Sequence, residues 1–214
     1  MKASFWHQIW AQGDIGFHNK KAHPFLVEHL ATLGLTKGSR VFLPLCGKTL
    51  DIGWLLSQGY RVVGAELSEF AITELFDELG IQPQISIEGE LTRYQAPDID
   101  ILVGNIFAIT PKNMGQVDAI YDRAALVALP ADMRAQYSAL LIKLSHGAAQ
   151  LLITFEYEQQ LLQGPPFSIT EAELLNHYAS NYQIKHITYK DVKGGLKGLV
   201  TAVEVLWLLQ KIRA

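Results

Sequence analysis

Apolar residues follow two spacings along this chain, and these spacings alternate from residue 40 onward. Residues 40–45 form a continuous apolar run, as expected of a strand buried on both faces. Residues 49–58 then have helical spacing, and residues 60–67 form a second, β-branched run. Residues 69–79 carry an apolar stripe of helical period behind Ser68, a suitable N-cap. Strands that alternate with helices predict parallel strands joined by right-handed crossovers.

The second half of the chain continues this alternation and then breaks it. We expect further strands over residues 99–106, 117–122 and 149–157, and helices over residues 131–144 and 170–180. Residues 184–189 and 199–209 are strand-like runs separated only by a Gly-rich turn, so they should pair antiparallel. We therefore predict an α/β, Rossmann-like fold with a mostly parallel seven-stranded sheet and an antiparallel edge strand. Residues 81–95 also allow a small additional hairpin.

The first 34 residues have no strand pattern. We expect a short helix there, a turn at residues 13–16 and a second helix over residues 24–33. Trp6 and Trp10 are four residues apart and so share one helical face. We interpret residues 1–34 as an N-terminal helical lid on an α/β core of residues 40–214, the whole forming one domain of 214 residues.

Composition narrows the classes of protein that this fold could serve. Hydrophobic residues make up 49% and charged residues 18%, which is typical of a globular chain. The formal net charge of −3 and the lack of a basic run argue against a nucleic-acid partner. No apolar run is long enough to span a membrane, and the single cysteine, Cys46, suits a reducing compartment. We expect a cytoplasmic protein, and nothing in the sequence demands more than a monomer.

Candidate chemistry lies where the first two strands of the core end. In open α/β sheets, ligands bind beyond the carboxyl ends of the strands. Gly47 follows the first strand and would let the backbone approach a bound nucleoside closely. Glu66 ends the second strand, 19 residues later, where a carboxylate can accept hydrogen bonds from both ribose hydroxyls. This pair suits any cofactor that carries adenosine.

Three cofactor classes compete for this pair of residues. A nicotinamide or flavin dinucleotide needs a G-x-G-x-x-G turn, but Pro44 and Leu45 stand where glycines would be required. A P-loop needs glycine at the position that Phe42 occupies. S-adenosylmethionine carries no phosphate, so it tolerates these departures and is favoured by elimination. Ordinary roles remain open, with Glu66 as a solvated acid that begins a helix and Gly47 as a turn residue.

Several motifs resemble the thiopurine S-methyltransferase family, and a bacterial member is the nearest likeness. They keep the family's order from residue 6 to beyond residue 200, and two of them are long and unusual. They are Trp6 and Trp10 with Phe17 and His18, then residues 42–48, 62–68, 121–130 and 164–167.

The resemblance implies a class I methyltransferase that uses S-adenosylmethionine, yields S-adenosylhomocysteine, and methylates small aromatic or heterocyclic thiols. Bacterial relatives are also associated with selenium and tellurium species. The cofactor contacts of the family fall on Trp10, Leu45, Glu66, Ile106 and Arg123. Phe17 and Arg123 are the candidates for the acceptor side. Relatives can carry an arginine near the acceptor in the C-terminal loop, whereas this chain offers Lys193 and Lys197.

Each of these assignments has a plainer alternative. Without the resemblance, Arg123 would be expected to pair with an acid such as Asp122, which could itself orient the loop. Cys46 is expected to be a small buried residue rather than a nucleophile. The histidines lack metal-ligand spacing, so no metal site is expected. The chain could also be a non-catalytic ligand-binding domain that kept the fold.

Overall fold

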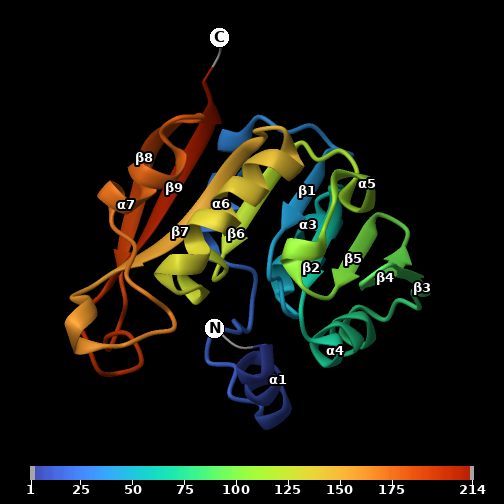
Figure 1. The fold of residues 1–214 in the computed structure, drawn as a ribbon, viewed down its shortest axis with the longest axis horizontal. Helices are drawn as coiled ribbons and strands as arrows, with labels where there is room; N and C mark the ends of the chain where they lie inside the picture. Colours follow the sequence, from blue (N-terminus) through green and yellow to red (C-terminus); the bar gives the residue numbers. More distant parts are fainter. Residues whose placement is uncertain (1–2, 213–214) are drawn as a thin grey trace. The chain divides into compact units, whose positions relative to one another are not determined.

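The computed structural model describes residues 3–212, so the first two residues of the expected lid lie outside it (Figure 1). The chain divides into two compact units, Met1–Ala119 and Ile120–Ala214. Each unit is an α/β arrangement in its own right and is described separately below.

The first unit contains a five-stranded arrangement in the order β3-β4-β5-β2-β1. Its parallel strands are β1 (Arg40–Leu43), β2 (Arg61–Glu66) and β5 (Ile99–Val103). In the register, β1 pairs with β2 and β2 pairs with β5. The remaining strands, β3 (Gln84–Glu88) and β4 (Leu91–Ala96), form an antiparallel hairpin that joins β5 (Figure 1). Five of the six residues of β2 are buried, which explains its continuous apolar run.

The helices of the first unit begin and end where the sequence provides caps. They are α1 (Ala3–Gln12), α2 (Pro24–His29), η1 (Leu30–Leu33), α3 (Leu50–Ser57), α4 (Glu69–Leu79), η2 (Ile106–Ala108) and α5 (Pro111–Met114). The Ser68 hydroxyl accepts the Ala71 amide at 3.3 Å and so begins α4. Gly80, at φ 66°, ends that helix in the left-handed region.

The second unit contains four strands in the order β6-β7-β9-β8. They are β6 (Ala119–Arg123), whose first residue belongs to the first unit, then β7 (Ala149–Glu156), β8 (Tyr182–Asp191) and β9 (Val203–Lys211). The pairs β7–β9 and β8–β9 are antiparallel. The helices of this unit are η3 (Leu126–Ala128), α6 (Ala131–Ser145), η4 (Gln159–Leu161) and α7 (Glu171–Tyr178).

All seven predicted strands are present among the described residues, and the β3–β4 hairpin adds the two strands that residues 81–95 allowed. The strand ends were predicted less well. The strand predicted to reach residue 106 stops at Val103, because Gly104 turns the chain at φ 140° and η2 begins at Ile106. The last strand begins at Val203 rather than residue 199, because the Leu196 amide donates to the Val200 carbonyl and closes a turn.

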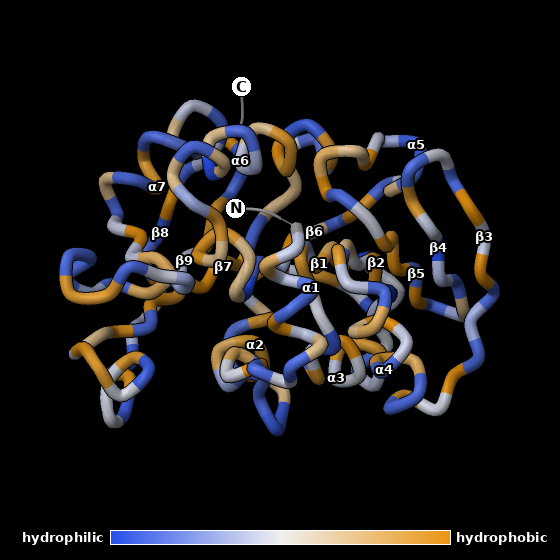
Figure 2. The backbone as a smooth tube through the Cα atoms, turned by 60° about the horizontal axis from the view of Figure 1, so that its bottom comes forward, coloured by the Kyte–Doolittle hydropathy of each residue, from blue (hydrophilic) through white to orange (hydrophobic). Residues whose placement is uncertain are grey.

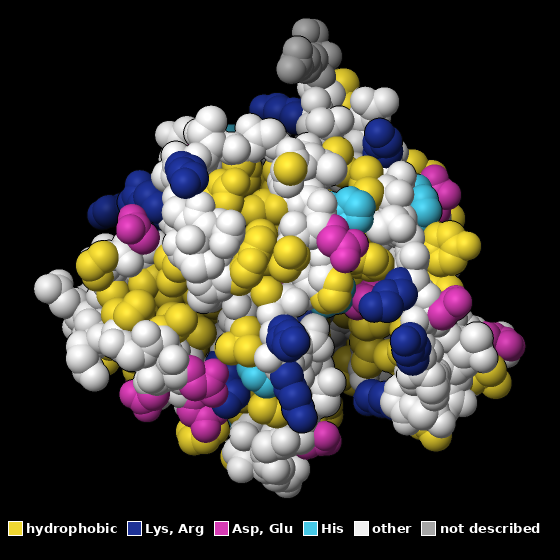
Figure 3. Space-filling view, turned by 180° about the vertical axis from the view of Figure 1, so that it is seen from behind, with side chains coloured by type: hydrophobic (Ala, Val, Ile, Leu, Met, Phe, Trp, Pro, Cys, Tyr) yellow, Lys and Arg dark blue, Asp and Glu magenta, His cyan; other side chains and the backbone are white. Residues whose placement is uncertain are grey.

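Hydropathy along the chain matches these elements. Hydrophobic stretches lie along several of the strands, whereas an exposed strand such as β8 is of mixed hydropathy (Figure 2). On the face shown in Figure 3, Lys and Arg side chains are scattered among acidic, histidine and hydrophobic ones. Among the described residues, no helix is both long and apolar enough to cross a membrane.

Candidate functional site

The loop between β1 and α3 has an unusual backbone for its sequence. Leu45 and Gly47 both lie in the left-handed region, at φ 46° and 51°. A non-glycine residue there is strained, and such strain is typical of ligand-binding loops. The Cys46 amide donates to the Ala65 carbonyl at 2.9 Å, which ties the loop to β2. The carboxyl ends of these two strands are therefore held together.

Glu66, the last residue of β2, has a buried carboxylate. Its Oε2 accepts the Gly47 amide at 2.8 Å, and its Oε1 accepts the amides of Leu67 and Ser68, each at 2.8 Å. Burial raises the pKa of Glu66, while the three backbone bonds act in the opposite direction. Glu66 is only 6% exposed, so the alternative that it is a solvated acid at the start of a helix is wrong. Glu66 instead joins the β1–α3 loop to the start of α4.

The free capacity of this carboxylate fits an adenosine ribose. A carboxylate offers about four acceptor positions, and three are used by backbone amides. One position on Oε2 is left for a ribose hydroxyl, so the two hydroxyls expected from the sequence could not both bind without sharing it. The Gly104 amide donates to the Glu66 carbonyl at 2.8 Å, which places the buried Ile106 segment next to the same strand end.

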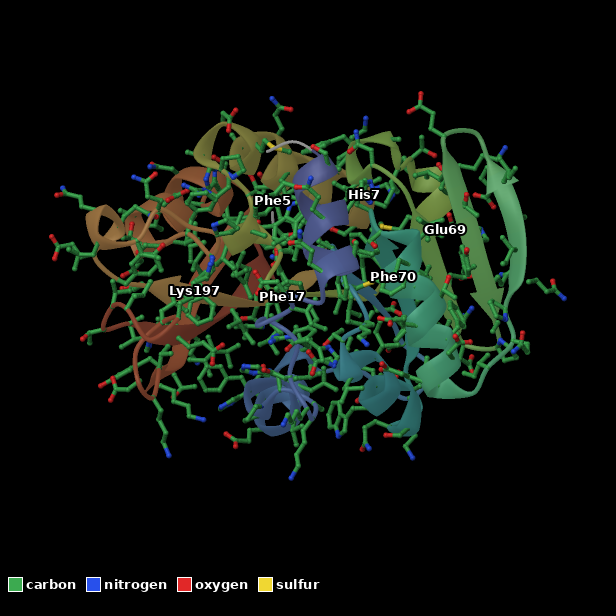
Figure 4. All side chains as sticks on the ribbon, turned by 90° about the horizontal axis from the view of Figure 1, so that it is seen from below. Phe5, His7, Phe17, Glu69, Phe70 and Lys197 are labelled. Carbon is green, nitrogen blue, oxygen red and sulfur yellow. The ribbon has the colours of Figure 1, made fainter. Side chains whose placement is uncertain are left out.

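An aromatic cluster of Trp6, Trp10 and Phe17 joins α1 to this loop. Trp10 is 4% exposed, and a Cβ on Gly47 would lie only 2.7 Å from its Cζ2 atom. Phe17 packs edge-on against both tryptophans, with centroid distances of 5.5 Å to Trp10 and 6.1 Å to Trp6. Figure 4 shows Phe17 beside the end of α1 and Phe70 at the start of α4. The shared helical face of the two tryptophans is confirmed, and Gly47 is required for this close packing.

The N-terminal segment is anchored to α3 at His23. The Asp51 carboxylate, 1% exposed, accepts the His23 amide at 2.6 Å. The His23 ring in turn accepts the Phe25 amide at 3.2 Å and caps α2. The contact joins residues 28 positions apart, and no local pattern predicts it.

Two further residues of the β1–α3 loop have structural roles. Lys48 pairs with Glu74 at 3.1 Å and with Glu78 at 2.8 Å, which fastens the loop to α4. Cys46 is buried, and burial raises its pKa well above the usual value, so the thiolate is disfavoured. The expectation that Cys46 is a small buried residue is confirmed. The spacing of Glu74 and Glu78 on one helical face was the available signal for the partners of Lys48.

In the second unit, Arg123 is the last residue of β6 and is half-buried. Asp122, before it, is fully buried and bound to other residues. Its Oδ2 accepts the Tyr137 hydroxyl at 2.7 Å, and its Oδ1 accepts the Leu126 amide at 3.1 Å. Burial raises the pKa of Asp122 to about 6. The Asp122 carboxylate is therefore buried and meets a donor at each oxygen.

Residues 164–167 are held firmly within the second unit. The Phe167 amide donates to the Val127 carbonyl at 2.7 Å, and the Tyr157 hydroxyl donates to the Pro166 carbonyl, also at 2.7 Å. The Arg134 guanidinium lies 5.5 Å from the centroid of the Phe167 ring. This rigid, partly apolar loop is suited to contact a planar ligand.

Lys193 and Lys197 are exposed on the loop between β8 and β9, where Figure 4 labels Lys197. Behind them, Leu196, Val200 and Ala202 form a small buried cluster. Among residues 3–212, no group of three or more His, Cys, Asp or Glu side chains is placed to hold a metal ion.

Several solved structures share the fold of this protein. The 1,6-didemethyltoxoflavin-N1-methyltransferase of Burkholderia thailandensis, solved with bound S-adenosylhomocysteine, matches with a TM-score of 0.65 at 17% identity. The match covers 98% of this chain and 87% of the other. An S-adenosylmethionine-dependent methyltransferase from Anabaena variabilis matches with a TM-score of 0.63 at 13% identity, over 98% and 95% of the two chains. The fold is thus that of the class I, S-adenosylmethionine-dependent methyltransferases, as predicted.

Sequence relatives identify the family within that class. Residues 1–211 match the thiopurine S-methyltransferase family. The thiopurine S-methyltransferase of Xanthobacter autotrophicus is 52% identical, over 99% of this chain and 100% of its own length. That of Teredinibacter turnerae is 51% identical, over 99% and 98%. The chain belongs to the thiopurine S-methyltransferase family, and its cofactor is S-adenosylmethionine.

Proposed function

We propose that this protein transfers the methyl group of S-adenosylmethionine to the sulfur of a small aromatic or heterocyclic thiol. The main support for this proposal is the match of residues 1–211 to the thiopurine S-methyltransferase family. The buried Glu66 carboxylate against Gly47 supports it, because it has the chemistry of an adenosine site without the glycines that a dinucleotide needs.

We assign cofactor binding to Trp10, Leu45, Glu66, Ile106 and Arg123, the positions that the family resemblance implies. Glu66 would accept one ribose hydroxyl, and the backbone at Ile106 would lie beside the adenine. Leu45 would face the cofactor from the strained loop, and the Trp10 ring would lie near its positively charged sulfur. Arg123 would bind a carboxylate or a polarised acceptor atom through its planar fork. Phe17 would contact both donor and acceptor.

The residues of this chain act by holding and orienting. When bound, S-adenosylmethionine supplies a methyl group that the acceptor sulfur takes by in-line displacement, with the bonding electron pair returning to the donor sulfur. The protein must keep the reacting atoms about 3–3.5 Å apart and in line. An acceptor thiol that is ionised near neutral pH needs no strong base. The anchored loop at residues 164–167 would form one wall for a planar acceptor.

A direct assay tests this function. Purified protein, S-adenosylmethionine and a heterocyclic thiol should give the S-methylated thiol and S-adenosylhomocysteine in equal amounts, measured by mass spectrometry. The matched oxygen analogue of the thiol serves as the acceptor control. Cofactor binding without methyl transfer to any thiol would indicate a non-catalytic binding domain instead. Selenium and tellurium species can replace the thiol in the same assay.

We expect the cofactor to slow hydrogen exchange across residues 3–23. Trp10 packs on Gly47, and the segment is fixed to α3 at His23, so a ligand that contacts Trp10 should stabilise the chain between these two points. Exchange measured by mass spectrometry with and without S-adenosylhomocysteine checks this, with β8 as an internal reference. Equal protection of residues 3–23 in both states would show a permanently packed helix rather than a lid.

Family membership and composition bear on the domain organisation, oligomeric state and location of the protein. One family match covers residues 1–211, which supports one methyltransferase domain over residues 1–214. We propose that residues 1–34 form a lid within it. We propose a monomer in the cytoplasm, acting on a small molecule without a nucleic-acid or membrane partner. The formal net charge of −3 and the single cysteine support this assignment.

A further inference from the structure

The buried carboxylate of Asp122 lies one residue before Arg123 and is bound from two other elements. Asp122 is 0% exposed on β6. Tyr137 of α6 donates its hydroxyl to Oδ2 at 2.7 Å, and the Leu126 amide, at the start of η3, donates to Oδ1 at 3.1 Å. Tyr178 of α7, also fully buried, interacts electrostatically with the same carboxylate. One side chain thus joins β6 to α6 and η3.

Burying a charge here is costly, so its retention calls for a reason. The penalty for a buried ion is several kcal/mol, and an apolar residue in the same place would avoid it. A carboxylate, however, is an acceptor at both oxygens, and Asp122 meets a donor at each. An amide in its place would direct an NH₂ group at one of these donors. The arrangement therefore depends on the ionised acid.

The bonds of Asp122 extend to both candidate acceptor-side features of this unit. They close the turn that carries Arg123 and Ala124, where Ala124 has the unfavourable φ of 61°. They also hold the start of η3, and the next residue, Val127, accepts the Phe167 amide at 2.7 Å. The loop at residues 164–167 is thus two hydrogen bonds away from Asp122.

We propose that Asp122, held by Tyr137, is the positioning residue that fixes Arg123 and, through η3, the loop of residues 164–167. It acts through these neighbours. The inference rests on the proposed roles of Arg123 and of that loop in thiol methylation.

Because Asp122 can be protonated, the positioning of Arg123 and of residues 164–167 should depend on pH. Burial raises the pKa of Asp122 to about 6, and the Tyr137 bond opposes that rise. Within the second unit, the titratable groups that face Asp122 are Tyr137 and Tyr178, both neutral in this range because burial raises their pKa values well above the usual one. A protonated Asp122 would bind the Leu126 amide less strongly and loosen the turn. Activity should therefore fall on the acid side of neutrality.

The experiment compares Tyr137→Phe with wild type and with Tyr182→Phe. Tyr182 is another tyrosine of this unit with a buried ring, and its hydroxyl donates to the Ala148 carbonyl at 3.0 Å, so it controls for the loss of a hydrogen-bonded tyrosine hydroxyl. Turnover is measured from pH 5.5 to 8.5 with a thiol acceptor that is ionised throughout, at saturating S-adenosylmethionine. Removing the Tyr137 hydroxyl should move the acid limb of kcat upward by about one pH unit, because a charge-assisted bond to the carboxylate is lost.

The pH profiles of the two variants decide whether Asp122 positions Arg123 and residues 164–167. A shifted acid limb in Tyr137→Phe, with a wild-type limb in Tyr182→Phe, supports the positioning role. Equal pH profiles in the two variants overturn it. If Tyr137→Phe does not fold, Asp122→Asn takes its place, and an acid limb as steep as that of wild type overturns the proposal. A wild-type protein that methylates no thiol would instead refute the proposed function.

Discussion

Replacing Glu66 with glutamine is expected to weaken S-adenosylmethionine binding by about 1–3 kcal/mol, roughly 5- to 150-fold in Kd. A bond from a ribose hydroxyl to a carboxylate is charge-assisted, and the same bond to an amide is weaker. Glutamine would also direct an NH₂ group at the Gly47 amide or at the amides of Leu67 and Ser68, all of which are donors. The loop that shapes the site would then be loosened as well.

Loop damage and loss of the ribose bond can be told apart. Cofactor affinity by calorimetry and the free energy of unfolding by urea should be measured on the same preparations. Glu78→Gln is the matched control, since Glu78 supports the same loop through Lys48 at 2.8 Å but lies on α4 away from the strand end. We expect Glu78→Gln to bind the cofactor as wild type does.

The comparison that matters most uses a cofactor analogue without the ribose hydroxyls. Wild type should bind this analogue about as weakly as Glu66→Gln binds S-adenosylmethionine. If Glu66→Gln folds and binds S-adenosylmethionine with unchanged affinity, Glu66 serves only to hold the Gly47 loop, and the ribose contact is wrong.

The elements of the fold could be predicted because their signals are local. The buried run at β2, the Ser68 cap and the Gly80 terminator of α4 each act within a few residues. Strand ends were less predictable, since they depend on turns such as the one between Leu196 and Val200. An apolar residue such as Leu199 fits a strand pattern, yet it is 71% exposed before the strand begins.

The candidate site, too, could be predicted only in part from the sequence. The position of Glu66 at the end of a strand followed from its spacing after Gly47, but its three backbone bonds could not be foreseen. A single sequence shows that an acid is present, and only the folded backbone shows which amides converge on it. The Asp122–Tyr137 pair is the clearer case, because the apolar pattern around Asp122 gives no sign of which helix supplies its donor.

Arg123→Lys is expected to reduce turnover by about 10- to 100-fold although the charge is kept. Lysine cannot reproduce the planar, two-pronged donor geometry of a guanidinium. Losing one hydrogen bond between charged groups costs about 1.5–3 kcal/mol, or roughly 10- to 150-fold in rate, and the expected loss lies within that range. If Arg123 made only an exposed ion pair, lysine would preserve it, and such pairs contribute only about 0–1 kcal/mol.

Arg93→Lys is a suitable control, because Arg93 makes a two-pronged bond to Glu88, at 2.6 and 3.1 Å, in the β3–β4 hairpin of the first unit. The same chemical change there should lower the free energy of unfolding while kcat stays at the wild-type value. For Arg123→Lys we expect the reverse, with thermal stability maintained and thiol turnover reduced. Turnover, cofactor affinity and melting temperature are measured on the same samples. If the Arg123→Lys protein turns over thiol at the wild-type rate, Arg123 is a structural residue. A ligand that needs two parallel hydrogen bonds from a guanidinium would not be bound equally well by the single ammonium group of lysine.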